Sequence, residues 1–166
     1  MNQRLVLGID PGLNITGYGI IDVGSGEPVL VEGGVLRSKR TDELPVRLQS
    51  LYKSLQEVFE SFSFEAVAME KLYSHYERPT TAIMMGHARG VLCLAAGQAN
   101  LPVFNYAATQ VKKMLTGNGR AGKAQVQIAI TRQLNLQQVP EPPDVADALA
   151  IAMCHHFLTQ SSASLT

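Results

Sequence analysis

Four carboxylates lie at the ends of apolar segments, where acidic side chains are uncommon. Asp10 and Glu70 each end a short apolar run, whereas Asp144 and Asp147 begin a long, alanine-rich one. Burying a charged carboxylate is costly unless a cation or a metal ion compensates it. We therefore expect the fold to bring these acids together, at a place where their repulsion requires cations.

Asp144 and Asp147 admit two interpretations. Their spacing of three places both side chains on about the same face of a helix's first turn. A single Asp in that position is most often a cap or a partner of the helix dipole. Considered together with Asp10 and Glu70, the pair instead indicates a site for two divalent cations, an arrangement suited to phosphodiester hydrolysis. Oxygen ligands favour Mg²⁺ or Mn²⁺ over zinc.

The formal net charge of zero hides a strong segregation of charge. Residues 78–140 contain seven basic side chains and no acid, so the remainder of the chain carries fourteen acids against seven bases. A segment of this kind indicates a polyanionic partner, although a solvated basic surface without a ligand is the alternative.

Composition predicts one domain over residues 1–158, followed by a tail over residues 159–166. No apolar run reaches the roughly 18 residues that a membrane span requires, so no membrane association is expected. Cys93 and Cys154 are far apart in apolar, helix-like segments. They are expected to be free thiols, which is typical of a reducing cytoplasm.

Hydrophobic periodicity predicts alternating strands and helices, hence an α/β fold. The expected strands are 4–9, 16–23, 29–37, 65–70 and 103–104, and the expected helices are 44–62, 80–99, 108–115, 122–135 and 144–158. The helix over 80–99 is apolar around almost its whole circumference, so it must be buried on more than one side. A symmetric homodimer and a fully internal core helix are both compatible with that pattern.

Two nucleotide-binding motifs are matched only in part. Residues 117–124 nearly form a phosphate-binding P-loop, but Ala124 replaces the hydroxyl residue that would bind Mg²⁺. Residues 9–19 resemble the first phosphate loop of actin-like ATPases and sugar kinases, which need a second such half. Neither motif makes nucleotide binding the preferred prediction.

The chain as a whole resembles the RuvC-type Holliday junction resolvases, which are ribonuclease H-like nucleases. The resemblance rests on several short motifs in order, namely Gly8-Ile9-Asp10-Pro11-Gly12, Thr16-Gly17-Tyr18-Gly19, Glu70-Lys71-Leu72-Tyr73, Gly86-His87-Ala88-Arg89-Gly90, Gln110-Val111-Lys112, Gly119, Lys123 and residues 144–152. It implies a ribonuclease H-like mixed five-stranded sheet flanked by helices, with the helix over 80–99 as a dimer interface.

The resemblance also implies an activity. It implies a homodimer that binds four-way DNA junctions and nicks two strands of like polarity symmetrically during recombination and repair, leaving 5′-phosphate and 3′-hydroxyl ends. Asp10, Glu70, Asp144 and Asp147 would be the catalytic acids and would bind Mg²⁺ or Mn²⁺, two ions per subunit. Association with the RuvA–RuvB branch-migration complex is implied as well.

The expected DNA contacts come from the same resemblance and from the acid-free segment. Tyr73 matches an aromatic position that contacts the junction, and Lys112 and Lys123 match basic positions near the cleaved phosphate. The remaining expected contacts are Arg78, Lys113 and Arg120. A catalytically silent junction-binding dimer, and a related ribonuclease H-like nuclease acting on structured RNA, are the alternatives.

Overall fold

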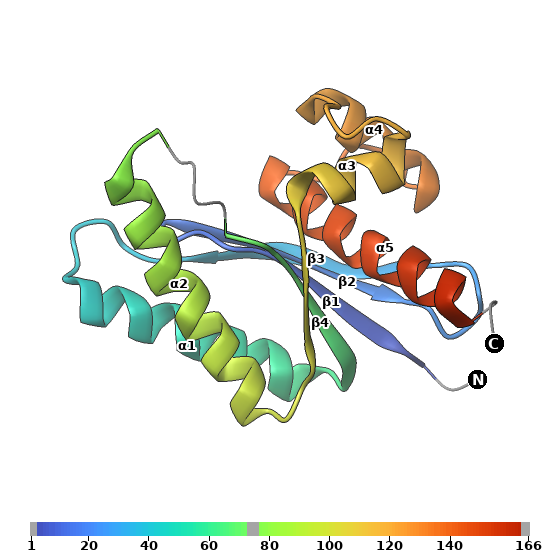
Figure 1. The fold of residues 1–166 in the computed structure, drawn as a ribbon. Helices are drawn as coiled ribbons and strands as arrows, with labels where there is room; N and C mark the ends of the chain where they lie inside the picture. The colour runs from blue at the N-terminus through green and yellow to red at the C-terminus, as the bar shows by residue number, and fades with distance from the viewer. Residues whose placement is uncertain (1–2, 73–76, 164–166) are drawn as a thin grey trace.

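The computed structural model describes residues 3–72 and 77–163, which form a central sheet with helices on both faces (Figure 1). The strands are β1 (Leu5–Asp10), β2 (Ile15–Asp22), β3 (Val29–Arg37), β4 (Phe64–Glu70) and β5 (Val103–Tyr106). The helices are α1 (Leu44–Ser61), α2 (Pro79–Gln98), α3 (Ala108–Thr116), α4 (Lys123–Gln133) and α5 (Pro143–Ala163). The strand order is β3-β2-β1-β4-β5.

The sheet is mixed because its two halves are connected differently. The first three strands form an antiparallel meander, and β4 and β5 then extend the sheet parallel to β1. Parallel strands β1 and β4 are neighbours and end at the same edge of the sheet. Asp10 and Glu70 are their last residues, so the topology brings these two acids to one place.

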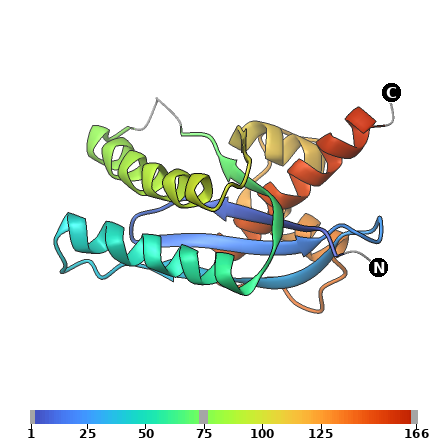
Figure 2. The ribbon, with the colours of Figure 1, turned by 90° about the horizontal axis from the view of Figure 1, so that it is seen from below.

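Two hydrophobic layers cover the two faces of the sheet. Helices α1 and α2 lie against each other on one face, and α5 crosses the other face with α3 and α4 outside it (Figures 1 and 2). Alternate residues of β1 supply both layers: Leu5, Leu7 and Ile9 face α1 and α2, whereas Val6 faces α5. All four are almost fully buried.

Glycines let α5 lie unusually close to the sheet. A Cβ atom added at Gly8 would lie 2.0 Å from the carbonyl oxygen of Ala148, and one at Gly17 would lie 2.1 Å from the carbonyl oxygen of Asp144. Both distances are shorter than van der Waals contact, so only glycine fits there. Because Gly17 is the register partner of Asp10, this packing sets the start of α5 beside the end of β1.

Most predicted elements are confirmed, and the differences lie at their ends. β5 continues to Tyr106, two residues beyond the predicted strand, and α5 continues to Ala163 rather than ending at residue 158. The extra turn of α5 contains serines whose hydroxyls donate to carbonyl oxygens one turn back, which satisfies them within a helix.

Helix α2 is not a fully internal core helix, which corrects one of the two interpretations of its apolar sequence. Ala88, Leu92, Ala95 and Ala96 are buried against the sheet and α1. Ile83, Met84 and Leu94 are exposed in the single chain, with 60% and 55% of the surface of Ile83 and Leu94 accessible. No helix in the described part of the chain is long and apolar enough to span a membrane.

Replacing Gly17 with Ala should destabilise the fold and displace the start of α5. The new methyl group would overlap the backbone of Asp144, and overpacking of this kind costs roughly 3 kcal/mol. Chemical unfolding would measure the loss. Gly122→Ala is the matched control, because nothing lies within 4 Å of its added Cβ. It should change stability by less than about 1 kcal/mol, and equal effects of the two substitutions would contradict this packing account.

Candidate metal centre and nucleic-acid interface

The four predicted acids converge on the edge where β1 and β4 end. Asp10 and Glu70 stand side by side there, and the first two turns of α5 supply Asp144 and Asp147 from the face above. The contact between Gly17 and the backbone of Asp144 fixes this approach. All four side chains are half-buried, so they are partly removed from water while remaining open to a ligand.

Burial and mutual repulsion make these carboxyl groups hard to ionise. The pKa of Asp10 is raised from 3.8 to about 8, first by burial and then by the charges of Glu70, Asp147 and Asp144. Burial also raises the pKa of Glu70, and the charge of Asp147 adds to that effect. The pKa of Asp147 is raised by burial, against the opposing influence of Lys123. The cluster is therefore short of positive charge.

Two lysines stand beside the acids. Lys123, the first residue of α4, places its Nζ 3.5 Å from Oδ2 of Asp147. Lys112 on α3 joins Lys123, Glu70 and Asp147 in lining a pocket of about 190 Å³. The side chain of Lys123 is 73% exposed, so its ion pair contributes little to stability. The exposed ammonium group of Lys123 can therefore also reach an anion that enters this pocket.

The donor types fit a hard divalent cation. Within the described residues, however, no group of three or more His, Cys, Asp or Glu side chains is arranged as a ready metal site. Asp10 is nonetheless destabilised as an anion by three neighbouring acids, and a cation with oxygen ligands would relieve that repulsion. The carboxylates thus fit such an ion by charge and chemistry, although their side chains are not in a ligating arrangement.

Two residues without a predicted role support the strand ends. The hydroxyl of Thr16, fully buried, donates to the carbonyl oxygen of Gly12 at 2.6 Å and accepts from the Gly12 N–H at 3.1 Å. This pair of bonds closes the turn that follows Asp10. Arg89 of α2 donates from Nε to the backbone oxygen of Glu70 at 3.2 Å. Both residues lie in motifs of the sequence, but only the fold reveals their contacts.

The other residues expected to contact DNA do not line the pocket beside the acids. Lys113 on α3, Arg120 between α3 and α4, and Arg78 at the start of α2 are exposed and make no part of the pocket at the acids. Tyr73 lies outside the described residues. The stretch before residue 117 is helix α3, as predicted, and not the strand that precedes the glycine-rich loop in P-loop proteins.

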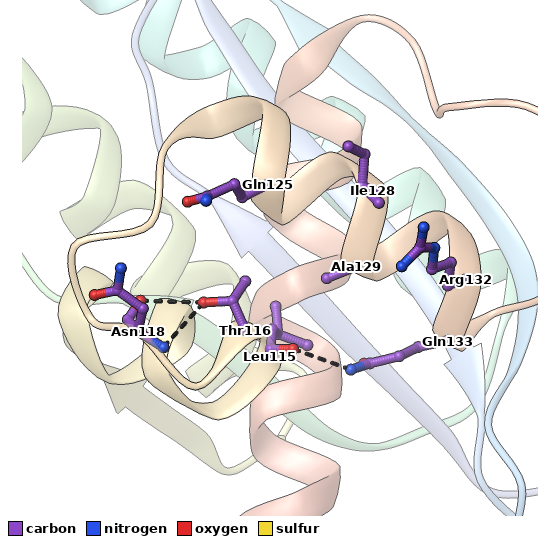
Figure 3. Close-up of a pocket in the computed structure, with 8 residues that line it drawn as sticks. All are labelled: Leu115, Thr116, Asn118, Gln125, Ile128, Ala129, Arg132 and Gln133. Carbon is purple, nitrogen blue, oxygen red and sulfur yellow. Dashed lines mark hydrogen bonds between the residues drawn. The ribbon is translucent and has the colours of Figure 1, made fainter.

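A second pocket, of about 400 Å³, lies between α3 and α4 away from the acids (Figure 3). Its polar groups are largely engaged with one another: Thr116 bonds to the backbone of Asn118, and Gln133 donates to the carbonyl oxygen of Leu115. Leu115, Ile128 and Ala129 supply its apolar part. No titratable acid lines it, so it offers no hydrolytic chemistry.

Asp10→Asn should stabilise the metal-free protein at pH 8 and leave its stability almost unchanged at pH 4. Because the folded state raises the pKa of Asp10 from 3.8 to about 8, stability is lost as the pH rises through this interval. The neutral amide avoids that loss, so at pH 8 the free energy of unfolding of the variant should exceed that of the unmodified protein by roughly 2 kcal/mol or more. Urea unfolding in EDTA across this pH range measures it.

Asp22→Asn is the matched control for this pH dependence. Asp22 also ends a strand, but its Oδ1 accepts the N–H groups of Arg4 and Gly24 at 3.1 and 2.9 Å, away from the four acids. The control should retain the decline in stability of the unmodified protein. A decline that is identical in Asp10→Asn would show that Asp10 is not strained by its neighbours.

Comparison with known proteins identifies the family. Residues 6–155 match the family model described as RuvC, crossover junction endodeoxyribonuclease. The protein of that name from Rhodopirellula baltica is 55% identical over 156 residues, covering 94% of this chain and 88% of the relative. The one from Thermotoga maritima is 45% identical over 155 residues, covering 93% and 92%.

The solved structures agree with the sequence comparison. Thermus thermophilus RuvC, solved in complex with Holliday junction substrate, superimposes with a TM-score of 0.89 at 34% identity, covering 96% of each chain. The yeast mitochondrial resolvase Ydc2 has the same fold, with a TM-score of 0.65 at 18% identity over 90% of this chain and 76% of the other. The predicted ribonuclease H-like fold is confirmed, and the chain belongs to the RuvC family of crossover junction endodeoxyribonucleases.

Proposed function

We propose that this protein is a structure-selective endonuclease that resolves four-way DNA junctions by nicking two strands of like polarity. The convergence of four half-buried carboxylates beside two lysines carries the proposal. Membership of the RuvC family supports the same activity, since the Thermus thermophilus relative was solved with a Holliday junction substrate.

The proposed reaction is hydrolysis of one phosphodiester bond at each site. Asp10, Glu70, Asp144 and Asp147 would hold Mg²⁺ or Mn²⁺, two ions per subunit. Such ions, when bound, supply Lewis-acid activation of water and neutralise charge on the phosphate. The strand ends carry Asp10 and Glu70, and the first two turns of α5 carry the other two acids.

The lysines have a separate role in this proposal. Lys112 and Lys123 lie at the pocket of Glu70 and Asp147, where an ammonium group can offset charge that develops on the phosphate. Lys123 would exchange its carboxylate partner Asp147 for the phosphate. Without such positive charge, the four acids would repel the DNA backbone.

The acid-free segment would hold the DNA on either side of the site. Arg78, Lys113 and Arg120 are exposed and belong to the acid-free segment over residues 78–140, which suits contacts to the phosphate backbone. Tyr73 follows Glu70 by three residues, and an aromatic ring there could stack on an unpaired base. These contacts rest on the family resemblance and on the charge pattern.

A homodimer accounts for both the symmetric cut and the exposed apolar face of α2. Ile83, Met84 and Leu94 would be covered by the same helix of a second copy. Two-fold symmetry would then present two sites to two strands of one junction. Association with the RuvA–RuvB branch-migration complex is a further part of the proposal that rests on the family alone.

Asp10→Asn and Glu70→Gln should each retain junction binding and lose cleavage. Both replacements keep side-chain shape but remove a charge that holds the cation, so cleavage should fall by at least about 100-fold. Labelled four-way junctions with Mg²⁺ or Mn²⁺ measure cleavage, and the same junctions in EDTA measure binding. Full nicking by either variant would contradict the assigned site.

The same assay separates the alternatives. Duplex DNA and structured RNA of equal length serve as comparison substrates. Binding without cleavage by the unmodified protein would favour a catalytically silent junction binder, and faster cleavage of structured RNA would favour a ribonuclease. The intact set of four acids argues against a silent binder, because carboxylates beside DNA weaken binding without a cation.

A further inference from the structure

Arg89 lies on α2, yet its side chain reaches the strand ends that carry the acids. It lines a small pocket together with Asp10, Glu70 and Met85, the last of which is also on α2. It is the only Arg or Lys within α2. The rest of α2 is mostly apolar and carries no other permanent positive charge.

The contacts of Arg89 join two neighbouring strands. Its Nε donates to the backbone oxygen of Glu70 at 3.2 Å, and a terminal nitrogen donates to Oδ1 of Asn105 on β5. The guanidinium is planar and its donors have a fixed geometry, so two simultaneous bonds fix its orientation. The side chain is half-buried: its bond to Glu70 is partly buried, whereas its bond to the exposed Asn105 lies at the edge of the sheet.

Glu70 needs such support because it is the last residue of its strand. β5 is a four-residue edge strand, and Glu70 pairs with Tyr106 at its end. The next backbone bond, from the N–H of Lys71 to the oxygen of Tyr106, is 2.9 Å long. Arg89 adds a bond from a third element at the same point. The carboxylate of Glu70 also faces the charge of Asp147, which tends to push the two apart.

We propose that Arg89 is a positioning residue, which fixes the end of β4 and the neighbouring Asn105 and so keeps Glu70 beside Asp10, where the proposed cation would bind. This inference rests on the carboxylate site of the proposed function. It assigns Arg89 no contact with the DNA or with the reacting atoms. Substitution of a residue that orients a metal ligand commonly lowers metal affinity or activity by about 10–100-fold.

Arg89→Met keeps the aliphatic stem and removes every donor, whereas Arg89→Lys keeps the charge but not the planar pair of bonds. Arg89→Met should weaken Mn²⁺ binding to the DNA-free protein and slow single-turnover junction cleavage, each by roughly 10–100-fold. Junction affinity in EDTA should stay unchanged. For Arg89→Lys, Mn²⁺ binding and the cleavage rate should lie between those of the unmodified protein and those of Arg89→Met. Calorimetry, quenched-flow cleavage and a gel-shift assay measure the three quantities.

Two further variants control the experiment. Lys53→Gln removes an exposed positive charge from α1 and should leave all three quantities unchanged. Asn105→Leu removes the second partner of Arg89 while keeping the arginine, so it should shift Mn²⁺ binding in the same direction by a smaller factor. The double variant with Arg89→Met should be no worse than Arg89→Met alone, since both act through one contact network.

Any of three results would overturn the proposal. The first is that folded Arg89→Met binds Mn²⁺ as tightly as the unmodified protein. The others are that Arg89→Met loses affinity for the junction but not for Mn²⁺, or that the effects of Arg89→Met and Asn105→Leu on Mn²⁺ binding add in the double variant. If Arg89→Met fails to fold, Asn105→Leu decides by the same Mn²⁺ measurement. If the unmodified protein binds Mn²⁺ but cuts no junction, only the proposed function is contradicted. The Mn²⁺ affinities of the unmodified protein and Arg89→Met would still decide the role of Arg89.

Discussion

The close approach of α5 to the glycines of β1 and β2 is the constraint on which the site depends. At Gly8 and Gly17 the helix backbone takes the space that a side chain would otherwise fill. Helix position is thereby fixed against the sheet by backbone rather than by adaptable side chains. Since Asp144 and Asp147 are in the first two turns of α5, this contact determines how far they lie from Asp10 and Glu70.

The site has an energetic cost that its surroundings offset. Half-buried carboxylates raise one another's pKa, and at neutral pH the folded chain must either keep Asp10 protonated or tolerate a strained anion. Extensive burial in the two hydrophobic layers stabilises the fold against this cost. A cation that relieves the repulsion would bind tightly for the same reason, so the destabilised cluster and the proposed metal affinity have one physical origin.

The sequence predicted the elements and the acids because these signals are local. Apolar runs with an acid at one end identified β1, β4 and α5, and parallel pairing of β1 with β4 then brought Asp10 and Glu70 together. β5 was predicted too short because Asn105 is polar and exposed on an edge strand, and α5 because its last turn is rich in serine. The hydrogen bonds of Thr16 and Arg89 could not be predicted, since they join residues through tertiary geometry.

The central claim is that the fold assembles four acids into a centre for a divalent cation. Calorimetric titration of the DNA-free protein with Mn²⁺, in buffers that differ in ionisation enthalpy, tests it most directly. With the pKa of Asp10 near 8, binding at pH 7 should release close to one proton per site, and that release should fall toward zero at pH 9. Saturable binding with no proton release at pH 7, or no binding at all, would contradict the account.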